Sequence, residues 1–118
     1  MRLHQLKSWG EFFDAIKRGD KLHDLRRNDR DYRVGDYIFL ERYDQFKGEY
    51  TGEYWFVRVS YITSNRVPCA FSSSALHRNY SLLSLQPVNG SRDSLEELHR
   101  MAANKLFVRP LDLSTDGL

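Results

Sequence analysis

The chain has 118 residues, a formal net charge of +2 and a hydrophobic fraction of 41%. This length fits one domain that buries a core without disulfides or metals, and so small a charge excludes a polycation that coats nucleic acid indiscriminately. The single cysteine, Cys69, excludes an intrachain disulfide and favours a reducing, cytoplasmic location. No apolar run approaches the roughly 18 residues that span a membrane, and no signal peptide is recognisable, so no membrane association is expected.

A short amphipathic helix is predicted over residues 9–17, whereas residues 1–7 alternate too briefly to be assigned. The apolar residues at helical spacing are Trp9, Phe12, Phe13 and Ile16. Ser8 and Glu11 have the spacing of a capping box at the helix start. Gly19 is expected to end the helix in a left-handed conformation.

Four strands are predicted after this helix, over residues 21–27, 37–43, 54–62 and 80–86. The first has no purely apolar face and is therefore expected at a cleft rim or a sheet edge. The second and third are expected to form a long hairpin, with Trp55, Val57, Val59 and Tyr61 on one face of the third. Residues 63–79 contain Pro68 and three consecutive serines, which favours a loop.

A second capping box, Ser94 with Glu97, predicts a helix that ends near Asn104. Its expected inward residues are Leu95, Leu98 and Ala102. Residues 114–118 are polar and are expected to fray. The elements together predict an α+β fold with a small sheet or barrel and a helix near each end.

Positive charge is concentrated between residues 17 and 33, which contain seven Lys/Arg against four Asp. Arginine presents planar donors that suit phosphate and stack on bases. At least two of four arginines in this stretch are expected to contact phosphate: Arg26, Arg27, Arg30 and Arg33. Alternatively, Asp29 and Asp31 neutralise these arginines in a solvated turn.

Lys21 and Asp24 are the candidates for chemistry. On a regular strand they point to opposite faces, so they converge only if the strand is twisted or bulged. A desolvated Lys21 amine would then have Asp24 as its partner or proton acceptor. The alternative is a surface lysine and a structural aspartate that pairs with Arg26.

The remaining polar and aromatic residues carry weaker signals. The histidines lack metal-ligand spacing, so neither a metal nor another cofactor is expected; they are His4, His23, His77 and His99. Some aromatic residues could stack on bases, although most are expected in the core: Tyr32, Tyr37, Tyr54 and Trp55. No phosphate-binding glycine loop and no nucleophile-elbow motif is present.

The order of these motifs resembles the ASCH group of the PUA-like superfamily, and most of all a branch of small bacterial and phage proteins. The matching segments are residues 4–7, 19–21, 24–26, 28–30, 35–36 and 50–52. The resemblance implies a PUA-like β-barrel of about five to six strands, with an N-terminal and a C-terminal helix. It places the domain at residues 1–90, with residues 91–118 as a helix and tail packed on it, and a cleft beside the strand at 21–26.

The resemblance also implies binding of single-stranded RNA or a nucleotide. The residues it assigns to binding are His4, Lys7, Lys21, Arg26, Asn28 and Arg30. The alternative is a hydrolase, either an N4-acylcytidine amidohydrolase or a ribonuclease, with Lys21 and Asp24 in the active site. Asp24 stands where the family usually has Glu and the deacylating branch has Thr. No Asp or Glu occurs between Arg58 and Leu85, where that branch has a further Glu. Binding is therefore preferred, and contact with a protein partner is a third option.

Overall fold

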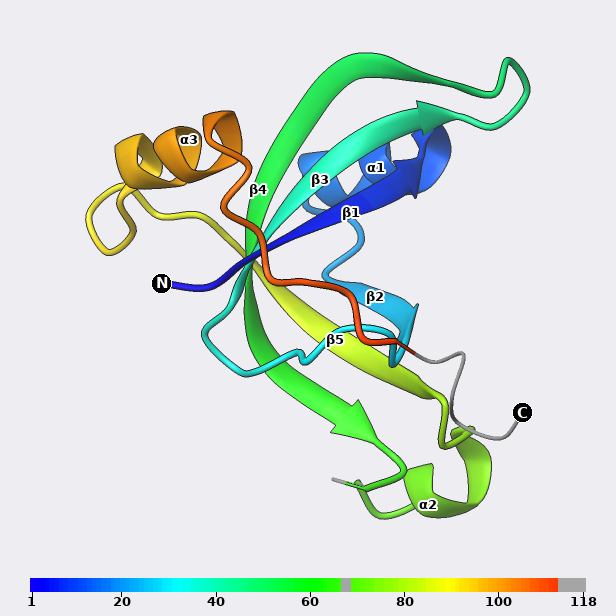
Figure 1. The fold of residues 1–118 in the computed structure, drawn as a ribbon. Coiled ribbons are helices and arrows are strands. Elements are labelled where there is room, and N and C mark those ends of the chain that lie inside the picture. Colours follow the sequence, from blue (N-terminus) through cyan, green and yellow to red (C-terminus); the bar gives the residue numbers. More distant parts are fainter. Residues whose placement is uncertain (67–68, 113–118) are drawn as a thin grey trace.

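One strongly curled sheet forms the body of the protein in a computed structural model that describes residues 1–66 and 69–112. The strands are β1 (Leu3–Trp9), β2 (His23–Arg27), β3 (Tyr37–Asp44), β4 (Glu49–Ser64) and β5 (Tyr80–Pro87). The helices are α1 (Gly10–Arg18), α2 (Ser72–Ala75) and α3 (Leu95–Ala103). The strand order is β1-β3-β4-β5-β2, with β1 parallel to β3 and the other pairs antiparallel. The sheet curls into a half-barrel (Figure 1), so the predicted α+β, barrel-like class is confirmed.

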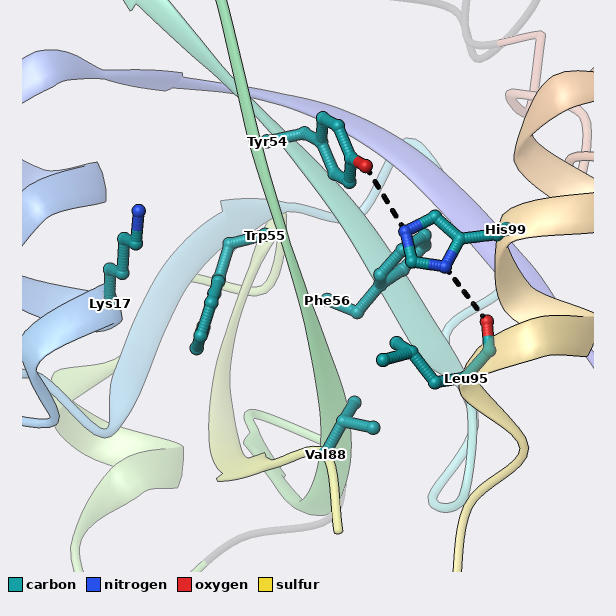
Figure 2. Close-up of a pocket in the computed structure, with 7 residues that line it drawn as sticks. All are labelled: Lys17, Tyr54, Trp55, Phe56, Val88, Leu95 and His99. Atoms are coloured by element: carbon teal, nitrogen blue, oxygen red, sulfur yellow. Dashed lines mark hydrogen bonds between the residues drawn. The ribbon is translucent and has the colours of Figure 1, made fainter. Parts of the chain in front are cut away.

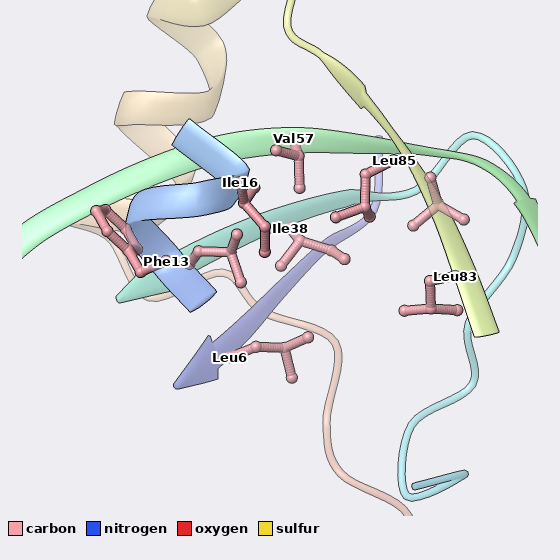
Figure 3. Close-up of a cluster of buried hydrophobic side chains, with 9 residues drawn as sticks. Leu6, Phe13, Ile16, Ile38, Val57, Leu83 and Leu85 are labelled. Carbon is pink, nitrogen blue, oxygen red and sulfur yellow. The ribbon is translucent and has the colours of Figure 1, made fainter. Parts of the chain in front are cut away.

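The concave face of the sheet holds the main hydrophobic core (Figure 3). Alternate side chains of each strand point to this face. Its buried members are Leu6, Phe13, Ile16, Ile38, Leu40, Val57, Val59, Leu83 and Leu85. Phe13 and Ile16 come from α1, which covers one end of the half-barrel with apolar side chains. Removal of the fully buried Phe13 ring by substitution with Ala would destabilise the fold by about 3–5 kcal/mol.

A second core lies on the convex face, where α3 packs against the sheet. Its buried residues are Leu3, Tyr37, Phe56, Leu98 and Met101. The loop before α3 is fixed by the buried Asp93 carboxylate. Asp93 accepts hydrogen bonds from the Tyr37 hydroxyl, from Arg92 Nη2 at 3.0 Å and from the Asn89 N–H at 2.8 Å. This helix thus covers one part of the convex face.

The N-terminal segment differs from the prediction. Residues 3–9 form a strand that the sequence did not reveal, because its first two residues are buried on opposite faces and hide the alternation. The capping box at Ser8 is wrong: Ser8 is a buried strand residue, and Trp9 precedes α1 with no side-chain cap. The left-handed end of the helix is confirmed, since Gly19 has φ 85°.

The four strands predicted after the first helix are all present in the predicted order, with two corrections, and β1 is a fifth. β2 begins at His23 rather than at Lys21, and it does lie at a sheet edge. A register shift between Val59 and Tyr61 reverses the facing of the residues that follow it. Tyr61 is therefore 56% exposed, and Ile62 packs against the core in its place.

The C-terminal half needs smaller corrections. The serine triplet belongs to α2, within the segment predicted to be a loop; Pro68 and residues 114–118 lie outside the described residues. Ser94 caps α3 by accepting from the Glu97 N–H at 3.2 Å, as predicted. The Glu97 carboxylate does not complete the box, because it accepts instead from Arg100 Nε at 2.9 Å. Leu95 is 45% exposed, and Met101 occupies the buried position beside Leu98.

The segment after α3 runs across the open side of the half-barrel (Figure 1). The Val108 N–H donates to the Leu3 carbonyl at 2.8 Å, and the Leu111 N–H donates to the Asp29 carbonyl at 2.7 Å. The chain thus links β1 to the loop between β2 and β3. No helix within residues 1–66 and 69–112 is long and apolar enough to cross a membrane.

Candidate functional site

The loop at residues 28–36 covers the end of the half-barrel opposite α1. It is held there by Asp36, whose side chain is buried and accepts three hydrogen bonds. The donors are Arg2 Nε at 3.0 Å, His4 Nε2 at 2.7 Å and the Arg33 N–H at 2.9 Å. These bonds connect the loop to β1 and fix the position of the arginines that it carries.

Gly35 makes the turn that brings this loop back to the sheet. Its φ is 95°, a conformation that residues with a Cβ rarely adopt. Its N–H donates to the Val59 carbonyl at 2.8 Å. An added Cβ would lie 3.7 Å from the Arg58 Nη2, which is ordinary contact, so conformation rather than space requires glycine here.

Between this loop and the end of the β4–β5 ladder lies a cleft of about 570 Å³, here called the arginine cleft. It is lined by Asn28, Arg30, Asp31, Tyr32, Arg33, Val34, Tyr61, Ile62, Ser64, Arg66, Asn79, Ser81 and Leu111. Three of these residues are cationic and one is anionic. The volume is within the range of ligand pockets, about 300–1,000 Å³.

The three arginines differ in their pairing. Arg30 is largely buried, with 18% of its side chain exposed, and lies 3.2 Å from the exposed Asp29 carboxylate. Arg33 is more exposed and binds Asp31 through Nη2 at 2.7 Å. No ion pair in the described part of the chain engages the exposed Arg66 side chain. The cleft therefore has donors available for an anion, since a guanidinium offers five N–H groups.

Tyr32 forms the inner wall of the cleft. Its hydroxyl is buried and has no hydrogen-bond partner among the described residues. Burial raises the pKa of Tyr32 to about 12, so the hydroxyl remains a donor at neutral pH. Its ring lies behind the cleft against His4, with ring centroids 4.9 Å apart.

His4 is wholly buried and does not reach the cleft surface. Burial lowers the pKa of His4, although its hydrogen bond to Asp36 acts in the opposite direction. Because a carboxylate only accepts, Nε2 carries the proton of the neutral ring and Nδ1 is an acceptor. Nδ1 has no partner within the described ranges. A buried donor, the Tyr32 hydroxyl, and a buried acceptor thus lie on adjacent rings.

Lys21 and Asp24 do converge. Lys21 Nζ lies 3.4 Å from Asp24 Oδ1 and donates to the His23 carbonyl at 2.6 Å. Lys21 precedes β2, so the opposite-face rule of a strand does not separate it from Asp24. Arg26 Nε also donates to Asp24 Oδ2 at 2.7 Å, so the contact expected of a structural aspartate is present too. Lys21 lines a separate hollow of about 140 Å³ and not the arginine cleft.

Of the six residues assigned to binding from the sequence, only Asn28 and Arg30 line the arginine cleft. The Lys7 side chain lies on the convex face, with Nζ 4.3 Å from the centre of the Tyr43 ring. This position separates it from His4, because alternate residues of β1 face opposite sides. Asn28 Nδ2 donates to the Arg78 carbonyl at 3.0 Å and its Oδ1 accepts from Ser81, so its amide has a structural role.

The sequence reasoning missed the cleft residues contributed by β4, β5 and the segment between them: Tyr61, Ser64, Arg66, Asn79 and Ser81. One signal was present in the sequence. Residues 58–85 contain three arginines and no acidic residue, which indicates a basic surface. Groups of three or more residues able to hold a metal ion are absent from the described residues.

Comparison with known proteins places the chain in a family. The family model described as "Domain of unknown function (DUF3850)" matches residues 3–85. The chain belongs to the DUF3850 family. The DUF3850 region contains β1 through most of β5 and every residue of the arginine cleft except Leu111. Helix α3 and the segment after it follow the matched region.

The chain is also similar to the "Uncharacterized 12.9 kDa protein in GpA 3'region" of Escherichia phage P2. The two are 31% identical over 62 residues, which cover 52% of this chain and 55% of the phage protein. The similarity thus spans about half the length of this curated relative. A phage relative fits the expectation that this is a protein of bacterial or phage type.

Proposed function

We propose that this protein binds single-stranded RNA or a nucleotide, with phosphate in the arginine cleft, and that its half-barrel is a PUA-like domain of the ASCH group. One observation carries the proposal. Arg30 and Arg33 from one loop and Arg66 from another segment converge on a single cleft that has one lining carboxylate, Asp31. Arginine binds phosphate with directed, charge-assisted hydrogen bonds.

The neutral lining of the cleft supports a base as well as a phosphate. Tyr61 is 56% exposed and presents an aromatic face beside the arginines. Stacking on such a ring is how single-stranded nucleic acid is often held without strict sequence preference. Asn79 and Ser81 add polar groups to the lining.

The test is binding of labelled hexauridylate by fluorescence anisotropy and of uridine 5′-monophosphate by calorimetry, between about 50 and 200 mM salt. Affinity should fall with salt, with a logarithmic slope of about −0.7 for each phosphate contacted. Arg66→Ala should weaken binding about tenfold, because it removes charge-assisted hydrogen bonds. Arg18→Ala is the matched control, since Arg18 pairs with Asp20 on an exposed surface outside the cleft. Failure of both probes to bind, or equal losses in the two variants, would contradict the proposal.

The alternative function is hydrolysis of a modified nucleoside, and the Lys21–Asp24 contact of 3.4 Å is the observation that favours it. The hollow beside Lys21 measures about 140 Å³, well below the roughly 300 Å³ at which ligand pockets begin. The Lys21 amine is also bonded to a main-chain carbonyl. These features make binding the better supported function.

Turnover decides between the two functions. N4-acetylcytidine and the hexauridylate are incubated with the wild type and with Lys21→Ala, and products are followed by chromatography. Product from the wild type and none from a folded Lys21→Ala variant would establish hydrolysis. Binding of the hexauridylate without product would support the binding function alone.

A further inference from the structure

β4 extends well beyond its neighbour β5, which leaves part of its length with a strand on one side only. β4 pairs with β3 from Glu49 to Arg58, but its ladder with β5 begins at Val57. β5 ends at Pro87, which has no N–H to continue a ladder, and the chain then turns away towards α3. Within residues 1–66 and 69–112, no strand therefore pairs with this edge of β4 before Val57.

Main-chain groups of Tyr54 and Phe56 face this open edge. The Val59 N–H donates to the Asp36 carbonyl and the Val59 carbonyl accepts from the Gly35 N–H, both at 2.8 Å and both on the β3 side. In an antiparallel ladder the direction of these groups alternates from residue to residue. The register with β3 is regular from Arg58 back to Tyr54. Since Val59 faces β3, the even-numbered residues Tyr54 and Phe56 direct their N–H and C=O groups away from β3.

The regular part of the open edge is short. The register with β3 shifts between Glu41 and Tyr43, and Gly52 opposite this shift has φ 90°. Such irregularities bend a strand and are one way in which proteins prevent long edges from pairing with other sheets. The edge left for pairing is therefore about Tyr54–Phe56.

A pocket of about 340 Å³ surrounds this short edge (Figure 2). It is lined by Lys17, Tyr54, Trp55, Phe56, Val88, Leu95 and His99. Figure 2 shows Trp55 and Lys17 on one side of β4, and Tyr54, Phe56 and His99 on the other. The exposed main chain thus lies between two groups of mainly apolar side chains.

The side of the pocket that faces α3 is held in place by His99. Its Nδ1 lies 3.1 Å from the Leu95 carbonyl and its Nε2 lies 3.1 Å from the Tyr54 hydroxyl. Since a carbonyl only accepts, Nδ1–H donates to it and Nε2 accepts from Tyr54. Both ring nitrogens are thereby satisfied, and this wall offers apolar surface to an occupant.

The side of the pocket that faces α1 carries a cation. Lys17 Nζ lies 5.5 Å from the centre of the Trp55 ring. No ion pair to Lys17 is found in the described parts of the chain, and no carboxylate lines the pocket. An acidic group is the charge complement of this side.

We propose that the open edge at Tyr54–Phe56 binds an extended acidic peptide of a partner protein, which adds to the sheet as a strand beyond β4. Addition of a peptide strand combines main-chain hydrogen bonds with pockets for alternate side chains. Because successive side chains of a strand point to opposite faces, apolar residues would contact Phe56, Leu95 and His99. The intervening acidic residues would face Lys17.

A second copy of this chain fits the edge less well than a peptide. The side chains of Lys17, Leu95 and His99 project from α1 and α3 on either side of the edge. A strand that belongs to another copy arrives with the same two helices, which would meet these side chains. A single extended peptide carries no helices and avoids this clash.

The test uses three capped peptides and the 15N-labelled protein in NMR titrations. The probe is acetyl-Val-Asp-Phe-Glu-Val-amide; the second peptide has Lys in place of Asp and Glu. The third is the probe N-methylated at alternate residues on its pairing edge, which removes its donors. The probe should shift the amide resonances of Tyr54, Trp55 and Phe56, with a Kd at or below about 1 mM. N-methylation should weaken binding at least about fivefold, because it removes hydrogen bonds.

Charge is tested with Lys17→Glu against Lys47→Glu, an exposed lysine outside the pocket. Lys17→Glu should weaken the acidic probe and strengthen the basic peptide, each about two- to fivefold, whereas Lys47→Glu should change neither. The proposal is overturned if no peptide shifts the three amides at about 1 mM, or if the N-methylated peptide binds as well as the probe. It is equally overturned if light scattering shows that the edge is already covered in a dimer from which the probe is excluded.

Discussion

The guanidinium of Arg26 donates from Nη2 to the main-chain carbonyl of Lys7 across 2.9 Å. Lys7 lies in β1 and Arg26 in β2, the two edges of the sheet. A closed barrel would join these edges by a ladder, and here a side chain joins them instead. Arg26 is positioned for this by its second bond, from Nε to Asp24.

Replacement of Arg26 by Ala should lower the free energy of unfolding by about 2 kcal/mol, because hydrogen bonds to charged groups typically contribute about 1.5–3 kcal/mol. The substitution also leaves the buried Asp24 carboxylate with Lys21 as its remaining described partner. Urea denaturation measures the change. Arg27→Ala is the control, since Arg27 is exposed on the opposite face of β2, and it should stay within about 0.5 kcal/mol. Equal losses in both variants would show that the link between the sheet edges adds nothing to the free energy of unfolding.

Stability should fall as the pH is lowered below 6.5, the ordinary pKa of histidine, because burial lowers the pKa of His4 in the folded protein. Arg2 and Arg30 act in the same direction and Asp36 opposes them. Just below pH 6.5 the unfolded chain takes up a proton that the folded chain does not. The stability that neutral His4 contributes at neutral pH is therefore lost as the pH falls from 6.5 to the lower pKa of His4 in the folded protein. The slope from this one group is at most about 1.4 kcal/mol per pH unit.

Chemical denaturation between pH 7.5 and pH 5 measures this effect, with His4→Gln and His77→Gln compared with the wild type. His77 is exposed and should leave the slope unchanged. A slope that persists in His4→Gln would assign the acid sensitivity to another group.

A second loss of stability is expected at much lower pH from Asp93. The bonds from Arg92, Tyr37 and the Asn89 N–H lower the pKa of Asp93 from 3.8 to about 2. Its contribution is therefore complete above pH 3.8 and is lost as the pH falls towards 2. Asp93→Ala should cost about 1–3 kcal/mol at neutral pH, because the Tyr37 hydroxyl loses its buried acceptor. Thermal unfolding of the variant at neutral pH that matches the wild type would refute this role.

Gly35→Ala should destabilise the fold by about 1–2 kcal/mol, the usual cost of forcing a residue with a Cβ to a positive φ. In a chain of this size each kcal/mol lowers Tm by about 4–8 °C, so calorimetry resolves the change. Gly90→Ala is the matched control, because Gly90 has no positive φ and an added Cβ meets nothing within 4 Å. If the two variants melt together, the conformation of Gly35 is not what anchors the loop.

Features determined by neighbouring residues were predictable from the sequence. The hairpin of β3 and β4 follows from its alternating, β-branched and aromatic residues, and the left-handed Gly19 follows from its place after the basic last turn of α1. Ser8 shows where such reasoning fails. Its spacing to Glu11 is that of a capping box, but the residues before it continue a strand whose inward position Ser8 occupies.

The candidate site was less predictable, because non-local pairing assembles it. Arg66 follows β4 and Arg30 follows β2. The two arginines share a cleft only because β5 lies between these strands and pairs with both of them. The register shift that exposes Tyr61 leaves no mark in the amino-acid pattern. Conversely, Lys21 and Asp24 were expected to meet only if the strand was irregular, and they meet because Lys21 lies outside it.

The strand order also has a consequence for how the chain folds during its synthesis. Among the strands that the structure describes, β2 pairs with β5 alone, so Asp24 remains without its strand partner Leu83 until nearly the whole DUF3850 region has left the ribosome. In contrast, β3 and β4 are adjacent in sequence and pair early. Contacts between distant segments slow folding, so the docking of β2 against β5 is a late event. A nascent chain released before β5 would leave the main-chain groups of β2 without their ladder, a substrate for chaperones or proteases rather than a smaller version of the domain.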